Sequence, residues 1–297
     1  MFLKSTVIAA LAVSTLSSPA LADFNIGGWI GVEYDFESYG SAKTSIITDT
    51  LLSYETGGNV FGVGFSGEFV SDDTRVGDLY FLYSSALNPG GRITLTYGEF
   101  YGAGNLMPED YFGVDDSTGR SENTFRVDYS NNGHHFAASV VTDDTEDFEL
   151  GYRGEFGAVS SSVAAWNLTI AYENDPQDLS ILLGHDRGNW GYDILSVLDL
   201  DDAGTADHVA FTLFYDVTPD LGLAWNVSWA YNTSELQSWG VLATYALSDS
   251  VRAKAEYVND TADGDYSYEF GLIYDFGKTQ PHHSERISYK EYYSRLR

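Results

Sequence analysis

The stretch "DYSYEFGLIYDF", residues 265 to 276, alternates between two kinds of side chain. Serine, glutamate, glycine and aspartate lie among the residues of one row, and the other row is Tyr266, Tyr268, Phe270, Leu272, Tyr274 and Phe276. A period of two predicts a β-strand with one polar and one apolar face. The fold depends on what the apolar face contacts, because that face can cover a protein core or lie against lipid.

The composition favours lipid over a protein core. Mean hydropathy is -0.19, and much of the 43% hydrophobic content is the 15% that is aromatic. A soluble sheet needs an apolar surplus from the rest of the chain to bury such a face, and this composition does not readily supply it. Tyrosine-rich rows suit a surface that is apolar in one band and wet at its edges. The row 266–276 is therefore predicted to face lipid, with its polar neighbours facing a watery lumen.

The rest of the chain repeats this alternation in short segments. Most are close to the ~9–11 residues that a tilted strand needs to cross a bilayer. The predicted strands lie near 24–36, 43–55, 59–70, 76–87, 91–101, 123–130, 134–142, 147–156, 162–174, 178–187, 189–200, 206–217, 221–231, 235–246, 250–259 and 265–276. We expect an all-β fold, a transmembrane antiparallel up-and-down β-barrel of about sixteen strands.

Two kinds of connection alternate along the chain almost without exception. One kind is tight and suited to hairpins, as in "TGG" (56–58) and "NNG" (131–133). The other is longer or more acidic, as in "TDDTED" (142–147) and "DLDDAGTAD" (199–207). Short turns on one side of a membrane and longer loops on the other are typical of outer-membrane barrels.

The two ends of the chain differ from the body. Residues 1–22 have one lysine, a short apolar stretch and the ending Ala20-Leu21-Ala22, which predicts a signal peptide cleaved before Asp23. Residues 23–276 form the predicted barrel. Residues 277–297 are mildly basic, and we expect a disordered C-terminal periplasmic tail; a cell-wall tether and a gene-model extension are the alternatives.

The charge of the body excludes one class of partner. From Asp23 to Gly277 there are 9 basic and 42 acidic residues, which gives a formal net charge of -33. A phosphate backbone would be repelled, so we expect no nucleic acid partner. Cations and divalent ions remain suitable partners.

One connection is far longer than the rest, and it carries a family resemblance. The stretch "GRITLTYGEFYGAGNLMPEDYFGVDD" resembles the fifth strand and inward-folded third loop of Rhodobacter-type porins, an alphaproteobacterial outer-membrane family. The whole body, Asp23 to Phe276, is similar to that family in plan. The resemblance implies a homotrimer of barrels in the outer membrane of a Gram-negative bacterium, with the third loop folded into the lumen. It implies a general diffusion porin for small hydrophilic solutes, which the acidic body makes cation-preferring.

The resemblance also implies roles for particular residues. The third loop would form the pore constriction, with candidates Asn105, Glu109, Asp110, Asp115 and Asp116. Basic residues that alternate with apolar neighbours should face that loop from the wall and set a transverse field with its acids: Arg126, Arg153, Arg252 and Lys254. Solvated lumen charges away from the constriction are the alternative.

The end of the last strand is the second motif of the resemblance. In that family, a final strand that ends in an aromatic residue is recognised by the outer-membrane assembly machinery, which assigns this role to Tyr274 and Phe276. The expected surroundings of the barrel are the lipid bilayer and lipopolysaccharide.

Other functions stay open. Acids of one outer loop, Asp201, Asp202 and Asp207, are candidates for weak Ca²⁺ or Mg²⁺ binding through oxygen ligands, and solvated loop charge is the alternative. We expect no other cofactor. A smaller or solute-specific barrel is the main alternative to a general porin. We expect no enzyme, because no local motif selects the Ser/His or Asp/His constellation that a barrel lipase or protease would need.

Overall fold

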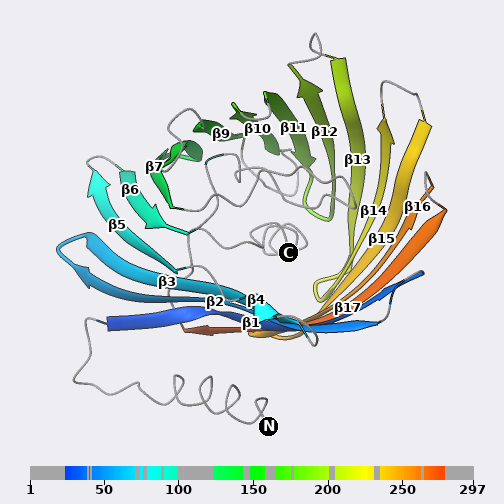
Figure 1. Cartoon of the computed structure of the whole chain (residues 1–297), viewed down its shortest axis with the longest axis horizontal. Helices are drawn as coiled ribbons and strands as arrows, with labels where there is room; N and C mark the ends of the chain where they lie inside the picture. The colour runs from blue at the N-terminus through cyan, green and yellow to red at the C-terminus, as the bar shows by residue number, and fades with distance from the viewer. Residues whose placement is uncertain are drawn as a thin grey trace.

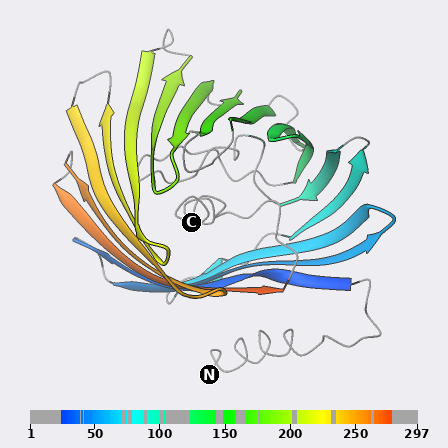
Figure 2. The ribbon, with the colours of Figure 1, turned by 180° about the vertical axis from the view of Figure 1, so that it is seen from behind.

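The computed structural model describes residues 24–38, 40, 42–70, 74–75, 79–87, 90–99, 103, 123–142, 148–157, 165–174, 177–200, 205–230, 235–261 and 264–277. Their strands form one antiparallel sheet that closes on itself, because β1 pairs with both β2 and β17. Figure 1 shows the strands around the wall, and Figure 2 shows from behind that blue β1 lies beside orange β17. The predicted antiparallel up-and-down barrel is confirmed.

Sixteen long strands build the wall, and each pairs with its neighbours in sequence. They are β1 (Phe24–Glu37), β2 (Lys43–Thr56), β3 (Asn59–Val70), β5 (Leu79–Leu87), β6 (Gly91–Gly98), β7 (Thr124–Asn131), β8 (His134–Val141), β9 (Phe148–Phe156), β10 (Ala165–Glu173), β11 (Asp178–Asp186), β12 (Trp190–Asp199), β13 (Thr205–Thr218), β14 (Leu221–Ala230), β15 (Glu235–Ser248), β16 (Val251–Asp260) and β17 (Asp265–Gly277). The two-residue strand β4 (Thr74–Arg75) pairs with the end of β3.

The sixteen predicted segments correspond to these sixteen long strands. The described strands begin at Leu79 and Ala165 and end at Gly98, and the predicted strand residues 76–78, 100–101 and 162–164 lie outside the described residues. No helix among the described residues is long and apolar enough to span a membrane. The predicted signal peptide and residues 278–297 lie outside the described part of the chain.

The apolar row of β17 lies on the outside of the barrel. Its members from Tyr266 to Tyr274 are 39–53% exposed, whereas Ile273 on the opposite face is 5% exposed. The same contrast runs round the wall: Phe61, Phe81 and Leu150 are among the exposed large hydrophobic side chains. An apolar outer face with a covered inner face is the arrangement of a barrel that spans a membrane.

Aromatic rings gather on the outer face near both ends of the strands. At the short-turn end, the Asn132-Gly133 turn has positive φ at both residues, as a two-residue hairpin requires. Ring contacts near that end are Phe24–Tyr54, Phe61–Tyr83, Phe136–Tyr152, Trp166–His185 and Tyr274–Phe276. Contacts near the opposite end are Phe36–Tyr268, Phe148–Tyr172 and Trp239–Tyr257. Two such girdles mark the membrane interfaces of outer-membrane barrels.

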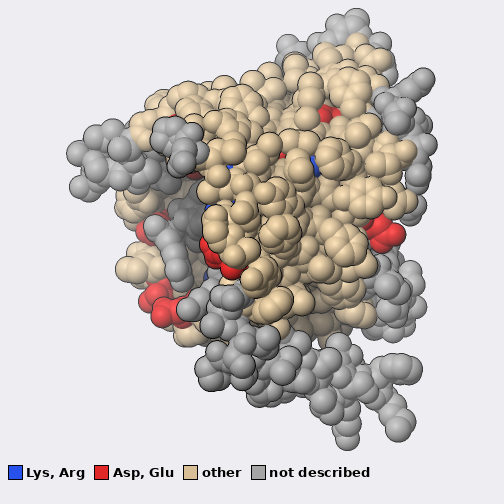
Figure 3. All heavy atoms as spheres, turned by 90° about the vertical axis from the view of Figure 1, so that its left-hand side faces the viewer, with Lys and Arg blue, Asp and Glu red and all other residues tan. Residues whose placement is uncertain are grey.

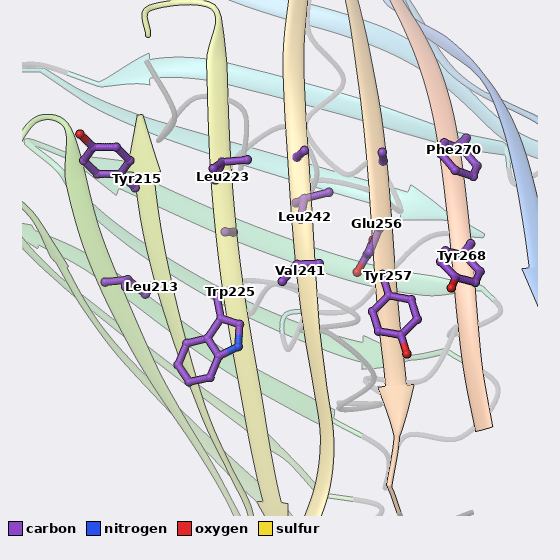
Figure 4. A pocket seen from close by; sticks show the side chains of 13 residues that line it. Leu213, Tyr215, Leu223, Trp225, Val241, Leu242, Glu256, Tyr257, Tyr268 and Phe270 are labelled. Atoms are coloured by element: carbon purple, nitrogen blue, oxygen red, sulfur yellow. The ribbon is translucent and has the colours of Figure 1, made fainter. Parts of the chain in front are cut away.

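The band between the girdles has little charge. Figure 3 shows one side of the molecule, where the described surface is mostly uncharged and acidic side chains lie mainly toward its edges. A hollow of about 520 Å³ lies on the outside of β13 to β17, and Figure 4 shows the residues that line it. Trp225 and Leu223 lie on one side of it, and Tyr257, Tyr268 and Phe270 lie on the other. Apolar and aromatic side chains thus line even the recesses of the outer face.

Candidate functional site

The inner wall of the barrel carries most of the described charge. Carboxylates outnumber basic groups there, which matches the net charge of the body. The inward acids include Glu33, Asp35, Asp49, Asp128, Glu149, Glu173, Asp193, Asp216, Glu256, Glu269 and Asp275. The inward Arg and Lys residues include Arg92, Arg126, Arg153, Arg252 and Lys254. The lumen is therefore lined by negative charge with a few basic side chains set into it.

Lys254 on β16 lies at the centre of an ion-pair cluster. Its Nζ is 3.0 Å from Oε1 of Glu33 on β1, and it also pairs with Glu269 on β17. Gly271 on β17 makes the reach to β1 possible: a Cβ there would lie 2.7 Å from Cε of Lys254. The lysine stem passes across β17 where that strand has no side chain, so one ammonium group links three strands.

Two arginines also pair with carboxylates of the wall. Arg126 is 2% exposed, and its Nη2 donates to Oδ1 of Asp128 at 2.8 Å. Nε2 of His135 on β8 lies 2.8 Å from the same oxygen. Arg252 on β16 pairs with Asp275 on β17. Since pairs inside a strand and pairs between neighbours both occur, the basic groups are held close to the wall.

The predicted wall residues therefore lie on the inner face, but their recorded partners are wall acids. Arg153, the fourth predicted basic wall residue, lies on β9 directly opposite His135 of β8. The predicted constriction residues, Asn105, Glu109, Asp110, Asp115 and Asp116, lie outside the described residues. A field between basic wall and acidic loop stays a prediction.

At the beginning of the long third connection, the structure describes Glu99 and Ala103. Ala103 is fully buried, and its backbone N–H donates to Oγ of Ser139 at 2.6 Å. Ser139 and Ala137, which packs with Ala103, face inward from β8. The chain thus enters the barrel after β6, as expected for a third loop folded into the lumen.

The other predicted sites have different outcomes. Tyr274 is 46% exposed, and its ring stacks on Phe276 at 6.3 Å at the short-turn end of β17. Asp201 and Asp202 lie outside the described residues, and Asp207 is in β13 with an undescribed side chain. Within the described ranges, no cluster of three or more His, Cys, Asp or Glu could hold a metal ion. Divalent binding at the acidic loop stays a prediction.

The sequence did not predict an apolar arc on the inner wall. We use this name for eight inward side chains of β10 to β15 that pack together: Ala171, Leu182, Leu195, Val197, Ala210, Phe214, Ala224 and Leu242. The segments "LSILLG" and "DILSVL" are apolar at nearly every position, so alternation does not show which members face inward. The loss of polar and apolar alternation in these two segments was the sequence signal for apolar side chains on the inner wall.

Solved structures give the fold a known counterpart. The sequence matches no family model and no curated protein. A triple mutant of the Rhodopseudomonas blastica porin is 14% identical with a TM-score of 0.64, and the match covers 85% of this chain and 100% of that chain. Another mutant of the Rh. blastica porin is 13% identical, with the same TM-score and coverage. At this identity the likeness shows a porin-type barrel fold, as the sequence resemblance implied.

Proposed function

We propose that the chain forms a water-filled channel in the outer membrane of a Gram-negative bacterium, through which small hydrophilic solutes diffuse. The observation that supports it best is the contrast between an exposed apolar outer face and an inner wall of ionised side chains. Sixteen-stranded barrels are wide enough to leave an aqueous channel. Charged and hydroxyl groups on the inner wall replace part of the hydration of a passing solute.

The channel prefers cations in this proposal. The inner wall has more carboxylates than basic groups, and the recorded pairs neutralise Arg126, Arg252 and Lys254 with wall acids. The surplus negative charge attracts cations and depletes anions in a confined aqueous space. The acids of the third loop, Glu109, Asp110, Asp115 and Asp116, are the proposed source of negative charge at the narrowest point.

Location and assembly follow from the two ends of the body. A signal peptide at residues 1–22 would export the chain, and the aromatic end of β17, Tyr274 and Phe276, would be recognised by the assembly machinery. The girdles of aromatic rings would lie at the two interfaces of a bilayer that contains lipopolysaccharide. The acidic loops, including Asp201, Asp202 and Asp207, would face outside, where weak Ca²⁺ or Mg²⁺ binding is proposed.

A homotrimer is the proposed assembly, and the outer face of β1 and β2 supports it. Gly28, Thr48 and Thr50 face outward there, and Thr48 Oγ1 donates to the backbone carbonyl of Trp29 at 3.1 Å. Small residues and hydroxyl groups at membrane depth let two protein surfaces approach closely. This part of the outer face suits another barrel better than lipid.

A solute-specific barrel is the second candidate, and the apolar arc favours it. A general porin needs only a hydrated wall, whereas Leu182, Leu195 and Phe214 form a buried apolar cluster on the inner side of this wall. We infer a channel rather than an enzyme, since the inner-wall groups described above are paired charges and packed apolar side chains.

Liposome swelling tests the proposal directly. Liposomes that contain the chain Asp23–Arg297 are placed in iso-osmotic solutions of a monosaccharide, a disaccharide and a larger oligosaccharide. A diffusion channel predicts swelling rates that fall steeply with solute size, and liposomes with heat-unfolded protein serve as the control. Swelling no faster than the control would contradict a channel, and rapid swelling with a single sugar alone would favour the solute-specific candidate.

A further inference from the structure

A hollow of about 790 Å³ lies at the short-turn end of the barrel, beside the turns that follow β11, β13 and β15. The segments that line it are 188–189, 216–220 and 245–249. Backbone hydrogen bonds join these segments: the N–H of Asp216 donates to the carbonyl of Asn189 at 2.9 Å, and the N–H of Ala246 donates to the carbonyl of Asp220 at 2.8 Å. The segments are therefore held together, so the hollow between them has a defined shape.

Part of this hollow is apolar and open. Three of its lining side chains, Val217, Tyr245 and Leu247, are 45%, 47% and 57% exposed. Tyr245 lies two residues from Ala243, which lines the hollow on the outside of β13 to β17, and residues two apart along a strand share a face. The apolar part therefore continues the outer face of the barrel to its short-turn end. Hydrocarbon that covers this surface is stabilised because apolar area is removed from water.

Two carboxylates also line the hollow. Asp220 and Asp249 come from different turns, and both are exposed. The ion pairs recorded among the described residues involve neither of them. At the edge of a membrane, a carboxylate attracts an ammonium group and repels a phosphate. Arg187 directly precedes the lining residue Gly188, so a guanidinium group, which suits phosphate, belongs to the neighbouring turn.

We propose that this hollow binds a phospholipid with a primary ammonium headgroup, of the phosphatidylethanolamine class. The ammonium group donates charge-assisted hydrogen bonds to Asp220 and Asp249, and the phosphate lies on the side of Arg187. An acyl chain of the same lipid covers the apolar part of the hollow. This inference rests on the proposed membrane location of the barrel, because the headgroups of a bilayer reach these turns only there.

Charge complementarity favours this lipid over other occupants of the hollow. A second copy of the chain would bring another body with a net charge of -33 toward Asp220 and Asp249. A purely apolar segment would take the two carboxylates out of water without supplying a partner, which is costly. An anionic lipid lacks the ammonium group, and the carboxylates repel its net negative charge. A lipid with both a cation and hydrocarbon satisfies both parts of the hollow.

Native mass spectrometry of the chain Asp23–Arg297 in detergent micelles is the first test. The micelles contain phosphatidylethanolamine, phosphatidylcholine or phosphatidylglycerol with identical acyl chains, and the fraction of protein that retains lipid is measured. We expect retention of phosphatidylethanolamine to be about tenfold higher, because only its headgroup donates ammonium hydrogen bonds to the carboxylates. Equal retention of phosphatidylethanolamine and either other lipid would overturn the proposal. Conductance of the same preparation tests the channel separately, so the two failures are distinguishable.

Removal of the two carboxylates is the second test. Asp220→Asn with Asp249→Asn should lower the retention of phosphatidylethanolamine about tenfold, to the level of the other two lipids. The matched control is Glu55→Gln with Glu155→Gln, which removes the same charge from exposed positions near the short-turn ends of β2 and β9 and should keep the preference. Gel mobility of unheated samples shows that each variant is folded. Equal effects of the two pairs would overturn the proposal.

A change in the apolar part of the hollow is the third test. Val217→Ser with Leu247→Ser should lower the retention of all three lipids to the same extent, because their acyl chains are identical. Unchanged retention in this variant would show that no acyl chain lies in the hollow, and it would overturn the proposal.

Discussion

Lys254 shows how single residues set the electrostatics of the lumen. Its ammonium group pairs with Glu33 and Glu269, and its side chain is fully buried. The alternation of β16 predicted that this lysine points inward. Its partners could not be predicted, because Glu33 lies on the first strand and becomes a neighbour only when the barrel closes. The open position at Gly271 is likewise visible only in three dimensions.

Removal of this lysine should destabilise the barrel. Lys254→Met leaves Glu33 and Glu269 close together without their shared cation, and breaking a buried pair in this way costs about 3–5 kcal/mol. Denaturant unfolding of the barrel in detergent micelles measures the loss. Lys43→Met, at an exposed position on β2, is the matched control and should change little.

A double variant tests whether the loss of stability in Lys254→Met comes from the uncompensated carboxylates. Adding Glu33→Gln to Lys254→Met should recover part of the lost stability, because one buried negative charge is removed. If Lys254→Met were no less stable than Lys43→Met, the lysine would not hold the three strands together.

At the level of elements, strands with strict alternation were predicted well. β17 presents aromatic or aliphatic side chains outward and, apart from Ile273, small or polar ones inward, so both its span and its facing could be predicted. β11 and β12 were located correctly, but Leu182 and Leu195 face inward beside apolar outward neighbours. Alternation distinguishes the faces only where the two sides of the wall differ in polarity.

Neighbouring residues of β16 allow a test of the two faces with one new side chain. Ala255 lines the outer hollow in the middle of the strand, and Glu256 is the direct cross-strand partner of the inward residue Leu242. Arginine on the lipid side near the midplane costs about 2–4 kcal/mol, so Ala255→Arg should lower the unfolding free energy by that amount. Glu256→Arg should cost much less, because its charge stays in water. Equal losses in micelle or bilayer unfolding would argue against a lipid-facing outer surface.

The end of β17 allows a test of assembly. Tyr274→Ser with Phe276→Ser should reduce the amount of heat-modifiable barrel in the outer membrane, measured by gel mobility of unheated samples. Tyr266→Ser with Tyr268→Ser, at the other end of the same outward row, is the control and should assemble more nearly as wild type. Equal assembly of both double variants would remove the special role assigned to the terminal aromatic residues.

For the whole molecule, the alternation of connections predicts topology. The described short turns, including 132–133, lie at the same end of the barrel as both ends of the wall, and the acidic connections lie at the other end. One connection departs from the pattern: β9 and β10 are joined by residues 157–164 at the short-turn end. The length of a connection alone therefore does not show at which end of the barrel it lies, whereas the order of the strands does.

Labelling of intact cells tests this topology. Ala203→Cys, in the acidic connection after β12, should react with an impermeant maleimide, whereas Asn132→Cys, in the turn between β7 and β8, should react only after the cells are opened. The native chain has no cysteine, so no background label is expected. Equal labelling of the two positions in intact cells would contradict the assigned orientation.

The zero-current potential of single channels in a KCl gradient tests the central claim most directly. The acidic lumen predicts cation preference that weakens as the Debye length falls from about 30 Å at 0.01 M to about 3 Å at 1 M salt. Changing the third-loop acids Glu109, Asp110, Asp115 and Asp116 to their amides should shift the potential toward anions more than the same change at Asp201, Asp202 and Asp207. A channel that prefers chloride in dilute salt, or one with no preference, would contradict the account.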